Sequence, residues 1–176
     1  MVAIALITLL YAGVTWQFRA IPAAGGFFGH FIGVLGFLLM VITEIVYSLR
    51  KRSRLARWGS MADWLKFHIF TGIVGPYMVL LHTSWKFKGL AGAVTVLTVI
   101  IVVSGFIGRY IFTRIPRNLE GLEIGEPASP QQAAALARAR RLLSLWHAIH
   151  IPIGMALFTA AFIHIGGALY YATLLK

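Results

Sequence analysis

The stretch HIFTGIVGPYMVLLH, residues 68–82, decides the fold of this chain. It begins and ends with histidine and has no charged residue in between. A second stretch, HIPIGMALFTAAFIH at residues 150–164, repeats the 14-residue spacing. At about 100° per residue, 14 residues make roughly four helical turns less 40°, so the two histidines of each stretch share one helix face. At about 1.5 Å per residue they lie roughly 21 Å apart, most of a ~30 Å hydrocarbon core.

The composition predicts an integral membrane protein. Of the 176 residues 59% are hydrophobic and 12% are charged, and the mean hydropathy is +0.82. A soluble domain has about 25% charged residues. The length predicts a single membrane domain, residues 1–176, with no separate soluble catalytic domain. The net charge of +11 does not indicate nucleic acid as a partner, because the basic residues lie at the ends of apolar runs, as membrane topology requires.

The apolar runs predict an all-α membrane helical bundle of about five transmembrane helices. The spans are expected at residues 2–16, 26–49, 64–85, 90–112 and 142–175. The first is short and has a signal peptide as its alternative; without a charged leader or a cleavage site, a retained span is favoured. Residues 113–141 are predicted as a polar cytoplasmic loop that includes a short surface helix, QQAAALARARR. This loop is longer than most connectors and is expected to dock a cytoplasmic partner subunit.

The distribution of Lys and Arg predicts the orientation. The connections at residues 50–57 and 109–141 hold five and six basic residues, whereas the other two connections hold one and two. Connections rich in Lys and Arg stay in the cytoplasm. Five spans then place the N-terminus inside and the C-terminus outside, and the spans at 64–85 and 142–175 run in the same direction.

The histidines of these two spans fall at matching depths. His68 and His150 lie toward the cytoplasm, and His82 and His164 lie toward the opposite face. An ionisable side chain inside a span is costly and usually functional, and neutral imidazole is a good iron ligand. Cysteine is absent, which excludes c-type haem attachment and thiolate iron–sulfur ligation within this chain. For any single histidine, an interhelical hydrogen bond or a place at the membrane interface remains the alternative.

Small residues continue the two histidine faces. Gly72 and Gly75 follow His68, and Gly154 follows His150. A flat porphyrin between helices needs small residues where it lies against backbone, although ordinary small-residue helix packing would use the same glycines. A zinc or iron transporter would instead want carboxylates beside its histidines, and neither stretch contains one.

The double histidine spacing resembles that of the two-haem cytochrome b membrane proteins. The likeness covers roughly residues 60–175 and is closest to the ferric-reductase and NADPH-oxidase type, with the respiratory cytochrome b subunits as broader relatives. In those families two helices carry two histidines each, and each haem takes one histidine from each helix. The resemblance implies four helices that form a haem-binding core. It implies two haem b groups whose irons take axial ligands from His68 with His150 (inner) and from His82 with His164 (outer).

Other residues are candidate contacts of the haem propionates or of a quinone, with an ordinary interfacial or anchoring role as the alternative. These are His147, His30, Lys66, Arg57 and Lys86. His147 could replace His150 as a ligand, but its 17-residue spacing to His164 would place it about 100° off that face. His30 is expected at a depth near His82. Glu44 is expected either to pair with Arg50 or a neighbour or to accept a proton from a quinol.

The sequence therefore predicts transmembrane electron transfer through two bis-histidine b haems. No flavin or nicotinamide domain follows the last span, which departs from the resembled family, so the chain is expected to be the membrane-anchor subunit of a quinone-linked oxidoreductase complex. No catalytic residue is expected, because bis-histidine iron has no open position, and the chain is an electron-transfer subunit rather than an enzyme alone. The expected partners are membrane lipid, quinone, and subunits with flavin, iron–sulfur or further haem cofactors, in a bacterial inner membrane. The alternative is a non-redox membrane subunit, either a metal permease or a pigment or assembly subunit.

Overall fold

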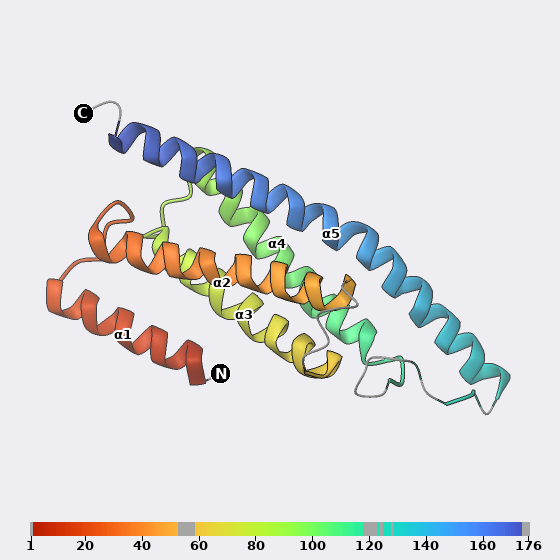
Figure 1. The fold of residues 1–176 in the computed structure, drawn as a ribbon. Coiled ribbons are helices and arrows are strands. Elements are labelled where there is room, and N and C mark those ends of the chain that lie inside the picture. The colour runs from red at the N-terminus through yellow and green to blue at the C-terminus, as the bar shows by residue number, and fades with distance from the viewer. Residues whose placement is uncertain (1, 53–58, 118–122, 124, 128, 174–176) are drawn as a thin grey trace. The chain divides into compact units, whose positions relative to one another are not determined.

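The computed structural model describes residues 2–52, 59–117, 123, 125–127 and 129–173. The described chain is all-α, as predicted, apart from one isolated antiparallel bridge between Arg117 and Glu123. Its helices, coloured from red to blue along the chain in Figure 1, are α1 (Val2–Phe18), α2 (Phe27–Arg52), α3 (Met61–His82), α4 (Gly89–Phe112) and α5 (Pro130–Thr173).

The first four helices begin and end within three residues of the predicted spans, but α5 differs. It starts at Pro130, so the predicted loop at 113–141 is shorter and its surface helix is the first part of α5. No glycine or proline occurs between Gln131 and Ile151, and therefore nothing in the sequence interrupts the helix there. With 44 residues α5 is about 66 Å long, roughly twice a hydrocarbon core, and part of it must project beyond the bilayer.

Four of these helices, α2 to α5, are long and apolar enough to cross a membrane, which indicates an integral membrane protein. The helix α1 is apolar but has only 17 residues, about 26 Å of helix, so its span stays a prediction. Bands of large apolar side chains remain exposed on α2 and α4, as contact with lipid requires. They include Phe31, Val34, Leu38, Ile45, Val99, Val103, Phe106 and Ile107.

The chain forms two compact units. One comprises Met1–Gly59 and Asp63–Thr95, and the other comprises Ser60–Ala62 and Val96–Lys176. We call them the first and second units. The first contains α1, α2 and nearly all of α3, and the second contains α5 and most of α4. The histidines of α3, His68 and His82, therefore lie in the first unit, and the histidines of α5, His150 and His164, lie in the second.

In the first unit, α2 and α3 pack antiparallel through glycine. A Cβ at Gly36 would lie 2.8 Å from the carbonyl oxygen of Gly75 and 2.9 Å from Met78 Cβ. Further along, the buried hydroxyls of Thr43 and Thr71 form a hydrogen bond at 2.5 Å. Small residues let membrane helices approach closely, and an interhelical hydrogen bond there fixes their register. We refer to this contact as the α2–α3 seam.

The helix α1 runs parallel to α3 within the same unit. Thr8 Oγ is 2.6 Å from the Tyr77 hydroxyl, and one turn later the Tyr11 hydroxyl approaches the Leu81 carbonyl oxygen at 3.5 Å. Apolar residues of α1, among them Ile4 and Ile7, cover the core of this unit. Because the first and third of five spans must run in the same direction, the parallel packing of α1 on α3 is the one expected if α1 is the first span.

In the second unit, α4 and α5 pack antiparallel. Near one end of this contact Ile115, Ala139 and Leu143 form a buried apolar cluster, against which Phe112 and Trp146 pack. Further along, Gly108 lies directly against the Trp146 ring, and the Ile101 side chain is the neighbour of Gly154. This pairing places the middle of α4 beside the first histidines of α5.

Candidate functional site

The structure places all four predicted ligands on uninterrupted helices. His68 lies in α3 and His82 is its last residue, while His150 and His164 both lie in α5. All four side chains are half-buried. The helical spacing predicted from the sequence is therefore present on both helices.

The His82 ring is oriented by α2. Its Nδ1 is 2.8 Å from the carbonyl oxygen of Gly29. Because a carbonyl oxygen only accepts, Nδ1–H is the donor, and the neutral ring then carries its lone pair on Nε2. The ring also packs on the backbone of Gly33, where a Cβ would lie 2.6 Å from His82 Cγ. These contacts fix both the tautomer and the orientation that metal-ligating histidines require.

The structure confirms that His30 lies at the depth of His82. Their ring centroids are 6.3 Å apart with an interplanar angle of 54°. The Nδ1 of His30 bonds the carbonyl oxygen of Gly26 at 3.2 Å, and the side chain is exposed. Among the described residues no third His, Cys, Asp or Glu completes a three-ligand metal site here or elsewhere. His30 is thus a neighbour of the outer histidine on α2.

His68 lies at the other end of the α2–α3 seam with an unsatisfied nitrogen. Its ring packs on Tyr47 with centroids 4.7 Å apart. Its Nδ1 is buried and has no hydrogen-bond partner in the part of the chain that the structure describes. A buried polar atom without a partner costs about 1–3 kcal/mol, so such an atom in a native protein needs an explanation.

His150 is held by α4 and by its own helix. Its Nδ1 is 2.9 Å from the Ser104 hydroxyl, and its ring stacks on Trp146 with centroids 4.5 Å apart and an interplanar angle of 30°. The Trp146 indole N–H donates to the Ser104 carbonyl oxygen at 2.7 Å and approaches the Ser104 hydroxyl at 3.0 Å. Ser104 therefore anchors the imidazole and the indole together.

Two other residues of α5 differ from His150 in their surroundings. His147 contacts the Trp146 ring, with centroids 4.7 Å apart, and lines an open surface pocket beside Arg140 and Ser144. His164 shares its helix face with the buried Leu157 and Ala161, which are 1% and 5% exposed. The face that the sequence assigns to the histidines is thus the inward face of α5.

The glycines on the histidine faces separate into two kinds. Gly75 packs closely against Gly36 and Met40 at the α2–α3 seam, which is the small-residue helix packing given above as the alternative to a porphyrin contact. Gly72 and Gly154 differ, because a Cβ there would find its nearest neighbours at 4.0 Å (Thr43 Cγ2) and 3.8 Å (Ile101 Cδ1). A methyl group would therefore fit in ordinary van der Waals contact one turn after His68 and one turn after His150.

The charged candidates differ in their surroundings. Lys66 forms an exposed ion pair with Asp63 at 2.9 Å, which suits an interfacial anchor. Lys86 is exposed in the connection that follows α3, and Arg57 lies outside the described residues. Glu44 accepts a hydrogen bond from the Ser48 hydroxyl at 3.0 Å, so one neighbour on its own helix contacts this carboxylate.

Sequence reasoning missed the residues that orient the imidazoles. Ser104 was one hydroxyl within an apolar span, and Trp146 was one tryptophan among several. The signal for Trp146 was present, since a residue four positions before His150 lies on the same helix face. Nothing in the sequence tied Ser104, Gly29 or Gly33 to a histidine, because those contacts join different helices.

The contact between Gly108 and Trp146 gives a test of this site. Gly108→Ala should displace the indole, break its bonds to Ser104 and destabilise the protein by about 1–3 kcal/mol, the usual cost of overpacking. Gly105→Ala is the matched control, because no atom lies within 4 Å of a Cβ there. Thermal unfolding in detergent, followed by near-ultraviolet circular dichroism, measures both. Equal unfolding midpoints for the two variants would contradict the described packing.

No family model matches the sequence, and no curated protein or solved structure is significantly similar to it. The case for a function therefore rests on the histidine pattern and on the geometry of its surroundings.

Proposed function

We propose that the chain transfers electrons across the membrane through two bis-histidine b haems. His68 and His150 bind the inner haem, and His82 and His164 bind the outer one. The observation that carries the proposal is the repeated 14-residue spacing on two uninterrupted apolar helices. Each proposed pair joins the first unit to the second, so the pairing itself is part of the proposal.

The surroundings of His68 and His150 fit a porphyrin. An added Cβ at Gly72 or Gly154 would make only ordinary van der Waals contacts, so the backbone beside these histidines is less tightly packed than at Gly75. The buried Nδ1 of His68 has no hydrogen-bond partner among the described residues, and a nearby cofactor group or ordered water would satisfy it. In the ligating tautomer, Nδ1–H of His150 donates to Ser104, which leaves Nε2 for iron.

The surroundings of His82 fit a ligand in the same way. The Gly29 carbonyl holds the Nδ1 proton, and Gly33 leaves room for the ring against the α2 backbone. A histidine that donates its second nitrogen to a carbonyl is the usual arrangement at a metal. His30, exposed beside it, remains a candidate for a propionate or quinone contact at this level.

The chain contributes orientation, burial and exclusion of water. When bound, haem supplies the one-electron couple, with a potential set by its axial ligands and its burial. Two imidazoles at each iron leave no open position, so the residues bind and orient but activate no oxygen. Apolar α2, α4 and α5 side chains face lipid and keep the interior dry. The function is that of an electron-transfer subunit with no catalytic residue.

The membrane orientation follows from the basic connections. The α2–α3 and α4–α5 connections lie on one side of the membrane whether or not α1 spans it, because two spans separate them. Since they carry most of the Lys and Arg, that side is the cytoplasm, and the C-terminus lies outside. With α1 as a span, the N-terminus lies inside. A bacterial inner membrane fits this scheme. Partner subunits with flavin, iron–sulfur or haem cofactors would dock at the cytoplasmic connection before α5. Quinone would be the membrane-soluble partner.

A reduced-minus-oxidised difference spectrum of the purified chain tests the proposal. We expect b-type haem bands and two haems per chain. A flat difference spectrum from protein produced with an adequate haem supply would refute the electron-transfer proposal. It would support the alternative, in which the histidines of a non-redox permease or assembly subunit make interhelical hydrogen bonds like that of His82 to Gly29.

A further inference from the structure

His82 is the last residue of α3, a position where helices commonly fray. The final carbonyl groups of a helix have no partner within the helix, so the last turn depends on other groups. Here the Thr83 hydroxyl donates to the Leu80 carbonyl oxygen at 2.8 Å. The Ser84 amide donates to the Leu81 carbonyl oxygen at 3.3 Å. The orientation of the proposed outer ligand therefore depends on how the turn after it is held.

One side chain fastens this turn to the connection between α1 and α2. Ser84 is buried, and its hydroxyl donates to the Pro22 carbonyl oxygen at 2.5 Å. The two residues are 62 positions apart in the chain, and both belong to the first unit. This buried hydrogen bond therefore joins the end of α3 to the segment that leads from α1 into α2.

The same connection supports the carbonyl group that orients the His82 ring. A Cβ at Gly29 would collide with the carbonyl oxygens of Ala23 and Ala24, so the connection packs directly on the Gly29 backbone. The Gly29 carbonyl oxygen in turn accepts the Nδ1 proton of His82, at an N···O distance of 2.8 Å. The α1–α2 connection thus contacts both the group that holds the imidazole and the turn that holds its helix end.

Unfavourable backbone conformations are concentrated in these two connections. Among the described residues, the non-glycine residues with positive φ are Arg19, Ser84 and Trp85, at 50°, 49° and 60°. Arg19 begins the α1–α2 connection, and the other two follow His82 within three residues. Left-handed φ is unfavourable for a residue with a Cβ, and it persists only where the surrounding contacts impose it. Such strain is typical of segments that position a functional group.

We propose that Ser84 is a positioning residue for the outer haem. By holding the turn after α3 to Pro22, its hydroxyl keeps the His82 ring in the orientation in which Nδ1–H bonds Gly29 and Nε2 is left for iron. The inference rests on the proposed role of His82 as a ligand and extends it to a residue that acts only through His82. Groups that orient a metal ligand change the affinity of the site although they do not bind the metal. Loss of the Ser84 hydroxyl should therefore affect one haem and not the other.

The variant Ser84→Gly separates positioning from simple stabilisation. Glycine removes the hydroxyl but adopts a φ of 49° without strain, so the thermal unfolding midpoint of the haem-free protein should change little. Transfer of haem from the purified full chain in detergent to excess apomyoglobin should become about ten- to hundredfold faster for one of the two haems, the usual effect of losing a group that orients a metal ligand. The other haem should keep its wild-type transfer rate.

Two further variants identify the cause and the haem that is released. Ser84→Ala removes the same hydroxyl without the backbone freedom of glycine, and it should release the same haem. Because His82→Ala should retain only the inner haem, the double variant Ser84→Gly/His82→Ala should transfer that haem at the rate of His82→Ala alone. The midpoint potential of the outer haem should also shift in Ser84→Gly while that of the inner haem stays, because hydrogen bonds around an axial ligand tune the potential.

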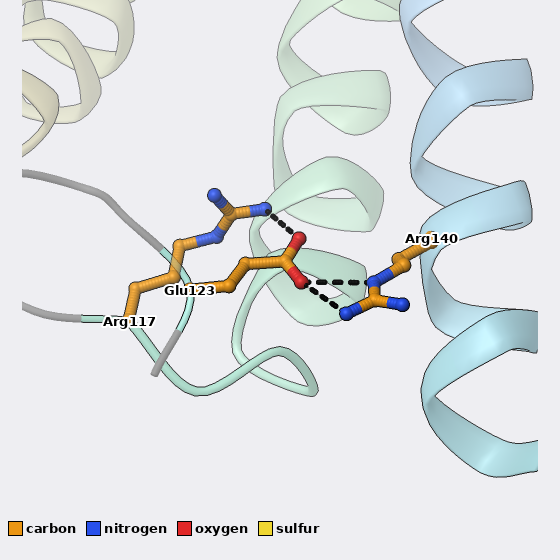
Figure 2. Close-up of polar contacts among 3 residues, drawn as sticks. All are labelled: Arg117, Glu123 and Arg140. Atoms are coloured by element: carbon orange, nitrogen blue, oxygen red, sulfur yellow. Dashed lines mark hydrogen bonds and ion pairs between the residues drawn. The ribbon is translucent and has the colours of Figure 1, made fainter. Parts of the chain in front are cut away.

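Two controls remove comparable contacts elsewhere. Thr113→Ala removes a hydroxyl that follows the end of α4 and bonds the Tyr110 carbonyl oxygen of its own helix at 2.8 Å. Glu123→Gln weakens a contact between a connection and a helix in the second unit. Figure 2 shows Glu123 between Arg117 and Arg140, where it accepts a hydrogen bond from Arg140 Nε at 2.8 Å. Both controls should leave the transfer rate of the outer haem unchanged.

The outcomes distinguish this inference from the proposed function. Two haems in the wild type with wild-type transfer rates in Ser84→Gly, or equal acceleration of both haems, would overturn the role of Ser84 and leave the proposed function intact. Fast transfer in Ser84→Gly with normal transfer in Ser84→Ala would assign the effect to backbone freedom and would also overturn it. A wild type that binds no haem would overturn both.

Discussion

Replacing His82 with alanine should reduce the haem content of the purified protein from two per chain to one. His150→Ala should do the same at the other level. The physical reason is that a bis-imidazole site that loses one ligand leaves an open position on the iron and loses most of its affinity, since a single histidine remains. Haem extraction and spectroscopic counting, normalised to protein by amino-acid analysis, measure the ratio.

The matched control for His82→Ala is His30→Ala. His30 lies 6.3 Å from His82 between ring centroids but is exposed, so its loss should leave both haems in place. No loss of haem in either His82→Ala or His150→Ala would remove the ligand assignment. If His30→Ala lost a haem and His164→Ala did not, the outer pair would lie wholly within the first unit, and the proposed pairing with α5 would be wrong.

The variant Gly36→Ala should destabilise the protein by about 1–3 kcal/mol, because its new methyl group would meet backbone and not a flexible side chain. The nearest atoms are the carbonyl oxygen of Gly75, the Cβ of Met78 and the backbone nitrogen of Val79, at 2.8, 2.9 and 3.0 Å, and none of them is the far end of a flexible side chain. The two helices must separate, and the hydrogen bond between Thr43 and Thr71 must lengthen. The lower unfolding midpoint should be visible by circular dichroism in detergent.

Gly13→Ala in α1 is the control for Gly36→Ala. No atom lies within 4 Å of a Cβ at Gly13, and alanine is the better helix former, so this variant should be neutral or slightly stabilising. Because the seam also carries the contacts of His82 with Gly29 and Gly33, Gly36→Ala should further loosen the outer haem. Equal unfolding midpoints for the two variants would show that the helices do not approach at Gly36.

The sequence was sufficient for the helices because each one is specified locally. Apolar runs of about 20 residues exclude water from their own backbone bonds, and a helix is then the stable structure in lipid. The error at α5 came from treating a change in composition, from basic and Ala-rich to apolar, as a change in structure. Helix formation continues through such a change, since no residue between Gln131 and Ile151 interrupts it.

Sequence alone also determined that each histidine pair shares one face of one helix, because helical period is a property of the backbone. Only the tertiary structure decided what those faces meet. The close approach of Gly36 to Gly75 brings Gly29 and Gly33 to His82, and the antiparallel packing of α4 brings Ser104 to His150. These contacts depend on backbone separation and register between helices, which residues far apart in the chain set jointly.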